Sequence, residues 1–352
     1  MKPSYISLLL VAAAAPAAGE NIVLKDWTGR GFAPDLVNYM IPAGQSPRVF
    51  DADGKPVPTQ VTGTTLSFVT AVAPSTTVTY TVRSDGPVAP PAVTTMKEGD
   101  ALVLANQLLA VKVPAAQEKT FDKTVAAETL PAPILALRGA DKTWKGEGKV
   151  LAKLPVKKFT VAQTVSGPVF CGIRYRLDYD GGGWYEATVR VTDRSPLAEV
   201  REEYDLGKVA EKNAEFWQLD LSKGWDADTS EHMNVAGQGF IKVTYPPIEQ
   251  DAAAASGSQS TDFDLSGGMM IHHDSCWGSR FVSYYGIHKA AERAADPDSY
   301  ALAMVAPLHK GEWRRANSMP VDIKGRQVRI LFPLDTAPTS IKTDPGTDTG
   351  PF

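Results

Sequence analysis

Residues 168–206, PVFCGIRYRLDYDGGGWYEATVRVTDRSPLAEVREEYDL, decide the fold of this chain. Apolar and polar residues alternate over 171–180, 184–192 and 198–205, and the turns between these runs contain Gly181-Gly182-Gly183 and Asp193-Arg194-Ser195-Pro196. A period of two, interrupted by glycine and proline turns, is typical of an antiparallel meander with one face in solvent. A helix would need apolar residues three and four positions apart, which this segment lacks. We predict that it forms the centre of a β-sandwich.

The composition is that of an ordinary globular protein. The chain has 352 residues, a hydrophobic content of 43% and a net charge of −4 from 36 Lys+Arg and 40 Asp+Glu. This length can hold two domains and bury a large core without metals or many disulfides. The charges are interspersed and form no basic stripe, which argues against a nucleic-acid or membrane partner.

Residues 1–19 have the three regions of a signal peptide in the usual order. Lys2 supplies a short positive region, residues 6–15 are apolar, and small residues at 15–19 offer a cleavage site. The apolar part is too short to span a bilayer, and no cysteine follows it to carry a lipid. We therefore predict a secreted or periplasmic protein. The alternative is that these residues form a buried N-terminal strand.

The spacing of strand and turn signals predicts an all-β chain with two domains. A small β-barrel or β-sandwich is expected over residues 20–85, a linker rich in proline and glycine over 86–95, and a larger antiparallel β-sandwich over 96–335. The polar tail over 336–352 would lead into a C-terminal domain if the chain is the front of a longer protein.

Several local features have their own interpretation. Asp51-Ala52-Asp53-Gly54 resembles the start of a calcium loop, but the late glutamate of that pattern is absent, so a hairpin turn is predicted. Cys171 and Cys276 could form one disulfide in an oxidising compartment, and two buried free thiols are the alternative. A lysine- and glycine-rich loop is expected over 141–149, and one short helix over 289–295.

The densest chemical stretch is residues 270–288, MIHHDSCWGSRFVSYYGIH. A polyuronate lyase needs a cation to neutralise the substrate carboxylate, a base to remove the C5 proton and an acid to protonate the departing oxygen. These groups would come from the following residues: Arg280, with His272 or His273 and Tyr284 or Tyr285. On a strand the two histidines face opposite sides, so at most one serves a given face.

Three other interpretations of this stretch remain open. It could form the core and rim of a sandwich, where tyrosine hydroxyls satisfy buried backbone groups. It could belong to a carbohydrate-binding surface, for which the predicted substrate contacts are Trp184, Trp225, Trp277 and His288, with Trp217 as a further stacking candidate. A metal site built on His272 or His273, with Asp274 and His288, matches no standard zinc spacing. We therefore predict no metal and no cofactor.

Other motifs indicate structure rather than chemistry. Gly181-Gly182-Gly183 lies between two expected strands and lacks the lysine of a phosphate loop. Asp193 and Ser195 have no nearby histidine with which to form a catalytic triad. Of Glu202 and Glu203, adjacent on an alternating strand, one is expected to face outward and the other a rim.

Two parts of the chain resemble a known family. DWTGRGFAPDLVNYMI (26–41) and RVFDADGKPVPTQV (48–61) resemble the small N-terminal barrel-like domain of large bacterial polysaccharide-processing proteins. LANQLLAVKVP (104–114) and CGIRYRLDYDGGGWYEATVRV (171–191) are similar to the central sandwich of the exo-rhamnogalacturonan lyase-like family. The resemblance implies a following α/α toroid, whereas no helical repeats follow Phe332 in this sequence. No catalytic residue is therefore transferred from the family.

Three functions follow as hypotheses. The first is an exported carbohydrate-active protein, the β-rich front portion of a polysaccharide lyase-like enzyme acting on acidic plant or algal polysaccharide. The second is a non-catalytic carbohydrate-binding or scaffolding module. The third is a cell-surface adhesion protein of stacked sandwiches. Fold analogy alone does not establish activity.

Overall fold

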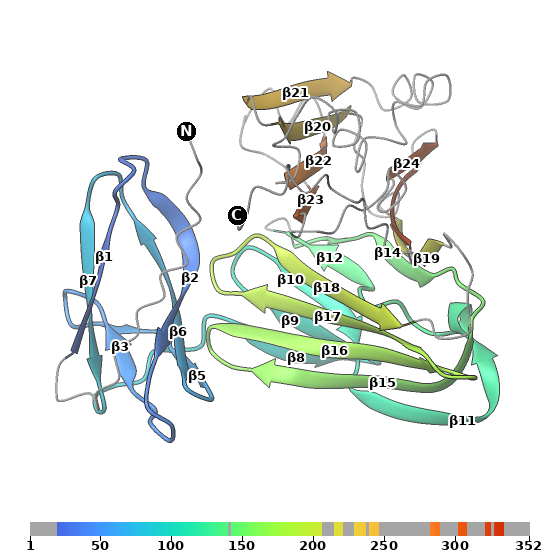
Figure 1. Cartoon of the computed structure of the whole chain (residues 1–352), viewed down its shortest axis with the longest axis horizontal. Coiled ribbons are helices and arrows are strands. Elements are labelled where there is room, and N and C mark those ends of the chain that lie inside the picture. Colours follow the sequence, from blue (N-terminus) through green and yellow to red (C-terminus); the bar gives the residue numbers. More distant parts are fainter. Residues whose placement is uncertain are drawn as a thin grey trace, which may run out of the picture.

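The computed structural model describes residues 20–139, 142–205 and 215–220, and the backbone of six strands between 229 and 333 (Figure 1). Within these residues the fold is all-β, as predicted. Strands follow one another along the chain, and one short 3₁₀ turn, Ala127–Thr129, interrupts them in the described part. Every strand pairing in the described sheets is antiparallel.

The N-terminal strands form a small sandwich of two sheets. Its strands are β1 (Glu20–Lys25), β2 (Phe32–Met40), β3 (Arg48–Phe50), β4 (Pro56–Val57), β5 (Gln60–Thr62), β6 (Thr65–Val72) and β7 (Thr77–Arg83). One sheet has the order β1-β7-β3-β4 and the other β2-β6-β5. The buried side chains between them are Ile22, Ile41, Val49, Leu66, Phe68 and Val82. Of the two predicted alternatives, barrel and sandwich, the chain adopts the sandwich.

The turn after β3 is the predicted hairpin. The side chain of Asp51 accepts hydrogen bonds from the backbone N–H groups of Asp53 (3.0 Å) and Lys55 (2.9 Å). Gly54 has φ of 76°, a left-handed conformation that glycine adopts without strain. The Asp51 carboxylate therefore serves the turn itself.

The larger unit begins with twelve strands. They are β8 (Thr94–Glu98), β9 (Ala101–Ala105), β10 (Ala110–Pro114), β11 (Gln117–Ala126), β12 (Ala136–Arg138), β13 (Trp144–Lys145), β14 (Glu147–Val150), β15 (Pro155–Ser166), β16 (Phe170–Tyr179), β17 (Trp184–Thr192), β18 (Ala198–Asp205) and β19 (Glu215–Asp220). The sheet β11-β15-β16-β17-β18, here called the meander sheet, packs against β13-β12-β10-β9-β8 around one core. The predicted meander is confirmed as β16, β17 and β18.

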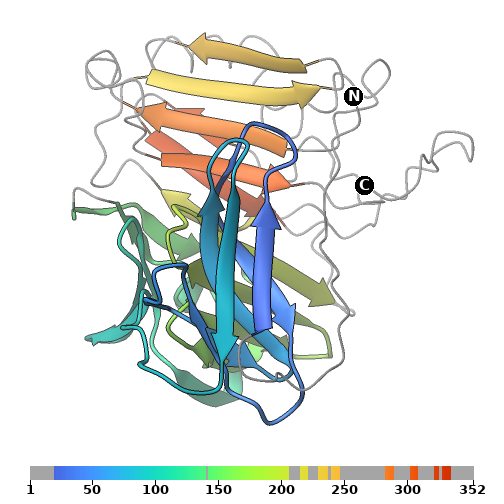
Figure 2. The same cartoon turned by 90° about the vertical axis from the view of Figure 1, so that its left-hand side faces the viewer.

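The remaining described strands come from the C-terminal part of the sequence. They are β20 (Thr229–Ala236), β21 (Gly239–Tyr245), β22 (Val282–His288), β23 (Leu302–Pro307), β24 (Val321–Lys324) and β25 (Gln327–Pro333). Two of them complete the sheet β14-β19-β25-β24. The other four form the sheet β21-β20-β22-β23, coloured yellow to orange across the top of Figure 2.

The inner face of the meander sheet is aromatic. Tyr175 and Tyr185 are fully buried, and their rings pack edge to face with centroids 6.2 Å apart. Tyr185 also packs on Phe216 of β19 at 4.1 Å, and Tyr175 on Phe159 of β15 at 5.3 Å. Such pairs stabilise a core beyond the area they bury, by about 0.5–1.5 kcal/mol each. The alternation along β16 and β17 thus places a continuous aromatic layer in the core.

The prediction of a loop over 141–149 is wrong in part. Residues 144–145 are β13, which pairs with β12, and residues 147–150 are β14, which pairs with β19. The backbone N–H of Gly148 donates to the carbonyl of Leu135 at 2.9 Å. This segment therefore crosses from one sheet to another. The helix expected over 289–295 and the signal peptide over 1–19 lie outside the described residues.

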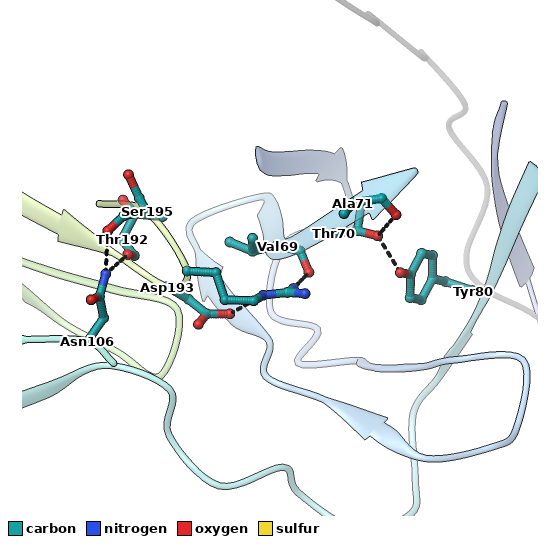
Figure 3. A network of polar contacts seen from close by, with 9 residues as sticks. Val69, Thr70, Ala71, Tyr80, Asn106, Thr192, Asp193 and Ser195 are labelled. Atoms are coloured by element: carbon teal, nitrogen blue, oxygen red, sulfur yellow. Dashed lines mark hydrogen bonds and ion pairs between the residues drawn. The ribbon is translucent and has the colours of Figure 1, made fainter. Parts of the chain in front are cut away.

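Polar contacts join the small sandwich to the turns of the meander (Figure 3). The buried side-chain oxygen of Gln60 accepts the backbone N–H groups of Val169 (3.2 Å) and Phe170 (3.0 Å). The guanidinium of Arg194 donates to the carbonyl of Val69 and lies 3.2 Å from the Asp193 carboxylate. On the other side of the same turn, the side-chain amide of Asn106 donates to the carbonyls of Thr192 (2.6 Å) and Ser195 (2.7 Å). The turn is thus held from both sides.

The buried tyrosines predict a loss of stability at alkaline pH. Burial raises the pKa of Tyr175, Tyr179 and Tyr185 well above the ordinary value of about 10. Near pH 10 these tyrosine hydroxyls can ionise only in the unfolded chain. Their contribution to the free energy of unfolding is therefore fully present below that pH. It is lost as pH rises from there towards the folded pKa, by up to about 1.4 kcal/mol per pH unit for each tyrosine.

Tyrosinate absorbance at 295 nm, followed together with circular dichroism, tests this expectation. Three tyrosines are expected to ionise only as the β-sheet signal is lost. Ionisation of every tyrosine near pH 10 with an unchanged sheet signal would contradict it.

Candidate functional site

The outer face of the meander sheet presents one tryptophan, Trp184, among charged side chains. Trp184 is the first residue of β17, and its register partners are Asp178 on β16 and Asp205 on β18. Because side chains alternate along a strand, the half-buried Trp184 lies on the face opposite to the fully buried Tyr185. The indole is therefore available from solvent at one end of the meander.

Arg176 fixes the indole in place. Its guanidinium carbon lies 4.6 Å from the centroid of the Trp184 ring, within the range of a cation–π contact. The same guanidinium donates to Asp178 at 2.9 Å through Nε and to Glu186 at 3.2 Å through Nη1. Burial alone would lower the pKa of Arg176, but its hydrogen bonds and the charges of the two carboxylates raise it. This arginine therefore stays charged and oriented.

Further charged groups extend the site along the sheet. Arg174 is half exposed, and its Nε lies 3.9 Å from Glu186, at the limit of an ion pair. Arg190 forms a shorter contact, with Nε 2.9 Å from the Glu199 carboxylate. Exposed pairs of this kind contribute about 0–1 kcal/mol to stability, so their groups can exchange partners at low cost. Arg174 is thus held less closely by its carboxylate partner than Arg176 and Arg190 are by theirs.

This arrangement can bind a ligand that carries hydroxyl groups. An indole offers a flat apolar face, and the surrounding guanidinium and carboxylate groups can donate to and accept from hydroxyl groups. Guanidinium groups do not deprotonate in proteins and cannot act as a general base. All five histidines of the chain lie at 232, 272, 273, 288 and 309, so the residues with described side chains include none.

The predicted catalytic stretch falls mostly outside the described residues. His272, His273, Trp277 and Arg280 lie there, as does Trp225. Cys276 and Asp274 also lie there, so neither a Cys171–Cys276 disulfide nor the alternative metal set is tested. The residues whose backbone is described are Tyr284, Tyr285 and His288, all on β22.

The backbone of β22 separates the two tyrosines. Positions 284 and 285 are consecutive in the strand and therefore lie on opposite faces of the sheet β21-β20-β22-β23. The register pairs Tyr285 with His232 of β20, a residue that was not among the predicted site residues. Partners directly opposite each other in an antiparallel pair share a face. The chain thus places one histidine and one tyrosine at adjacent positions of the same face.

One of the stacking candidates lies in the core. Trp217 of β19 is fully buried, and its indole N–H donates to the side chain of Glu202 at 2.9 Å. The hydroxyl of Tyr185 donates to the same Glu202 oxygen at 2.5 Å. Trp217 therefore belongs to the core and cannot stack on a ligand. Of the adjacent glutamates, Glu202 faces inward and Glu203 outward, where it pairs with Arg201 at 2.6 Å.

Comparisons with known proteins do not assign a family. No family model matches the chain, and no curated protein matches it. In the described part of the structure, no helix is long and apolar enough to cross a membrane. No group of three or more His, Cys, Asp or Glu side chains that could hold a metal ion occurs among the residues with described side chains.

Proposed function

We propose that this protein is an exported carbohydrate-active protein that binds polysaccharide on the outer face of its meander sheet. The observation that supports this proposal is the half-buried Trp184, held by Arg176 at 4.6 Å and flanked by Asp178 and Glu186. A sugar ring presents C–H groups to an aromatic face and hydroxyl groups to neighbouring polar side chains. The site provides both kinds of partner within one small area.

One guanidinium of the site, that of Arg174, can bind an acidic polymer. Arg174 is half exposed, and its contact with Glu186 is long, so a substrate carboxylate can replace Glu186 as its partner. A guanidinium binds a carboxylate through two parallel hydrogen bonds when the geometry allows. Uronic acid units carry such a carboxylate on the ring, which places it beside the stacked face.

Removal of the indole is expected to weaken binding about tenfold. A central aromatic contact contributes about 1–2 kcal/mol to binding, and about 1.4 kcal/mol corresponds to a factor of ten in Kd. The test is affinity electrophoresis of wild-type protein and Trp184→Ala in gels that contain polygalacturonate or its methyl ester. Trp184→Ala is expected to be retarded less than wild type in both gels.

Trp144 provides a matched control. It is also half-buried and contacts two cations, Lys112 at 4.4 Å and Arg138 at 4.7 Å from the ring centroid, but it lies on β13 in the opposite sheet. Trp144→Ala is expected to migrate like wild type. The proposed site would be overturned if Trp184→Ala were retarded as much as wild type, or if only Trp144→Ala were retarded less.

A second candidate function is the predicted polysaccharide lyase activity. It is favoured by the register that pairs His232 with Tyr285, because histidine and tyrosine are the residue types that a lyase uses as base and acid. β-Elimination creates an unsaturated uronide that absorbs near 235 nm. Absorbance at 235 nm with acidic polysaccharides, measured for wild type and for His232→Ala, His272→Ala, His273→Ala and Tyr284→Phe, tests this function. No increase for wild type would exclude it for those polymers.

A further inference from the structure

The loop between β1 and β2 in the small sandwich exposes a second tryptophan. Trp27 is 74% exposed, the highest value among the large hydrophobic side chains of the described residues. The loop lies beside the β6–β7 turn at one end of the small sandwich, the upper end in Figure 1. A tryptophan in such a position loses the apolar contacts that normally hold it in a core. The indole is therefore accessible to a binding partner.

A buried carboxylate holds this loop in one conformation. The Oδ1 atom of Asp26 accepts from the backbone N–H (2.8 Å) and the hydroxyl (2.7 Å) of Thr28. Its Oδ2 atom accepts from the backbone N–H groups of Gly31 (3.0 Å) and Ser75 (2.8 Å). The bond from Ser75, more than any other, holds the pKa of Asp26 well below its usual range. The carboxylate therefore stays ionised and fastens the loop to the β6–β7 turn.

Gly31 completes this fixed geometry. Its φ is 75°, and a Cβ atom at this position would lie 2.8 Å from the carbonyl oxygen of Val72. Only glycine combines that conformation with so close an approach. Trp27 is thus presented on a loop whose backbone is already ordered. Binding to a preordered group avoids part of the entropy cost of association.

One cation contacts the exposed indole, and a second belongs to the same loop. The Lys25 ammonium lies 4.4 Å from the centroid of the Trp27 ring, and the exposed Arg30 follows three residues after Trp27. Among the described residues, no carboxylate forms an ion pair with either cation, since Asp26 points inward and has its four hydrogen-bond partners within the protein. The loop therefore combines an apolar ring with local positive charge.

We infer that this loop, with Trp27, Lys25 and Arg30, is a second binding site for anionic polysaccharide, separate from the Trp184 site. The inference rests on the proposed carbohydrate function. The Lys25 ammonium lies over one face of the indole, so a uronic acid ring can stack its C–H face on the other face and direct its carboxylate past the ring edge towards Lys25 or Arg30. Insertion into a membrane would instead carry that ammonium towards hydrocarbon, which is unfavourable. The anionic sugar is therefore the partner that the local chemistry favours.

Affinity electrophoresis in two gels tests the inference on the full chain. In polygalacturonate, Trp27→Ala and the double variant Lys25→Gln/Arg30→Gln are expected to be retarded at least threefold less than wild type. In fully methyl-esterified pectin, which has the same backbone without the charge, the double variant is expected to be retarded as much as wild type, each measured against its own mobility in a gel without polymer. Retardation of wild type in polygalacturonate is also expected to fall more steeply with added NaCl than that of the double variant, because exposed charges are screened by salt.

The controls separate this inference from the Trp184 proposal. Val88→Ala removes another side chain that is 71% exposed, outside the loop, and is expected to leave retardation unchanged. If polygalacturonate retards Trp27→Ala as much as wild type but retards Trp184→Ala less, the second site is overturned and the first site stands. If polygalacturonate instead retards Trp184→Ala as much as wild type but retards Trp27→Ala less, the first site is overturned.

Two further results would overturn the second site. One is the absence of wild-type retardation in polygalacturonate, alginate and chondroitin sulfate, which would also overturn the proposed function. The other is co-sedimentation of wild type, but not Trp27→Ala, with vesicles of phosphatidylcholine and phosphatidylglycerol in the absence of retardation by the polymers. That outcome would assign the loop to a membrane surface.

Discussion

Replacement of Gly148 by alanine is expected to destabilise the protein by more than about 4 kcal/mol. A Cβ atom at this position would lie 1.6 Å from the carbonyl oxygen of Ile134 and 3.2 Å from the Cβ atom of Ala132. Ile134 and Ala132 are buried in the main core, so neither can move aside without disturbing it. Overlap with backbone in a packed core belongs to the small class of substitutions with effects of this size.

The expected mechanism is separation of β14 from its neighbours. Gly148 donates to the carbonyl of Leu135 and pairs with Leu219 of β19, so its displacement breaks contacts to two segments at once. Urea unfolding followed by tryptophan fluorescence measures the effect. The matched control is Gly182→Ala: Gly182 has φ of 91° and a Cβ atom there would meet no other atom within 4 Å, so only backbone strain of about 1–2 kcal/mol is expected. An unfolding midpoint of Gly148→Ala at or above that of Gly182→Ala would contradict the close approach.

Replacement of Glu202 by alanine is expected to lower the free energy of unfolding by about 2–5 kcal/mol. The Glu202 carboxylate accepts from the hydroxyl of Tyr185 at 2.5 Å and from the indole N–H of Trp217 at 2.9 Å, and both donors belong to fully buried residues. Removal of the acceptor leaves two buried donors without this partner, at about 1–3 kcal/mol each. Truncation of a half-buried glutamate on an edge strand would otherwise have little effect.

Two variants define what is lost. Glu202→Gln keeps a side-chain oxygen that can accept both hydrogen bonds and is expected to retain most of the stability. Glu203→Ala removes the adjacent carboxylate, which is exposed and pairs with Arg201 at the surface, and is expected to change stability by less than about 1 kcal/mol. The unfolding free energy of each variant in urea is the measurement. If Glu202→Ala and Glu203→Ala lowered the unfolding free energy equally, the buried Tyr185 hydroxyl and Trp217 indole N–H would have found other acceptors, which would contradict this expectation.

The sequence predicted the fold where the hydrophobic pattern was strong. The alternation over 171–192 identifies β16 and β17 because each strand buries one face and exposes the other. The strand β11 was not predicted, since its sequence QEKTFDKTVA is mostly polar and does not alternate, and the strand is largely exposed at the sheet edge. The short strands β13 and β14 were assigned to a loop, because two to four residues with lysine and glycine carry no readable period. Their pairing comes from tertiary contacts.

The sites were predictable to a smaller extent. Trp184 was predicted as a substrate contact, and its outward position follows from the alternation along β17, but the sequence of a strand does not reveal that Arg176 stacks on it from the neighbouring strand. Trp217 was kept open as a stacking candidate because its inward direction depends on the pairing of β19 with β14 and β25. Trp27 was not selected, since the Asp26 contacts that order its loop include Ser75, far along the chain. Contacts between distant segments decide these roles.

The most direct test of binding at the meander sheet is the indole N–H spectrum of the protein labelled with ¹⁵N, titrated with oligogalacturonate. The chain has seven tryptophans, so the resonances are few and can be assigned by single Trp→Phe variants. We predict that the Trp184 resonance moves with saturable dependence on ligand, while that of Trp217, buried and bonded to Glu202, stays in place. A Trp184 resonance that does not move when other indole resonances shift to saturation would contradict binding at the meander sheet.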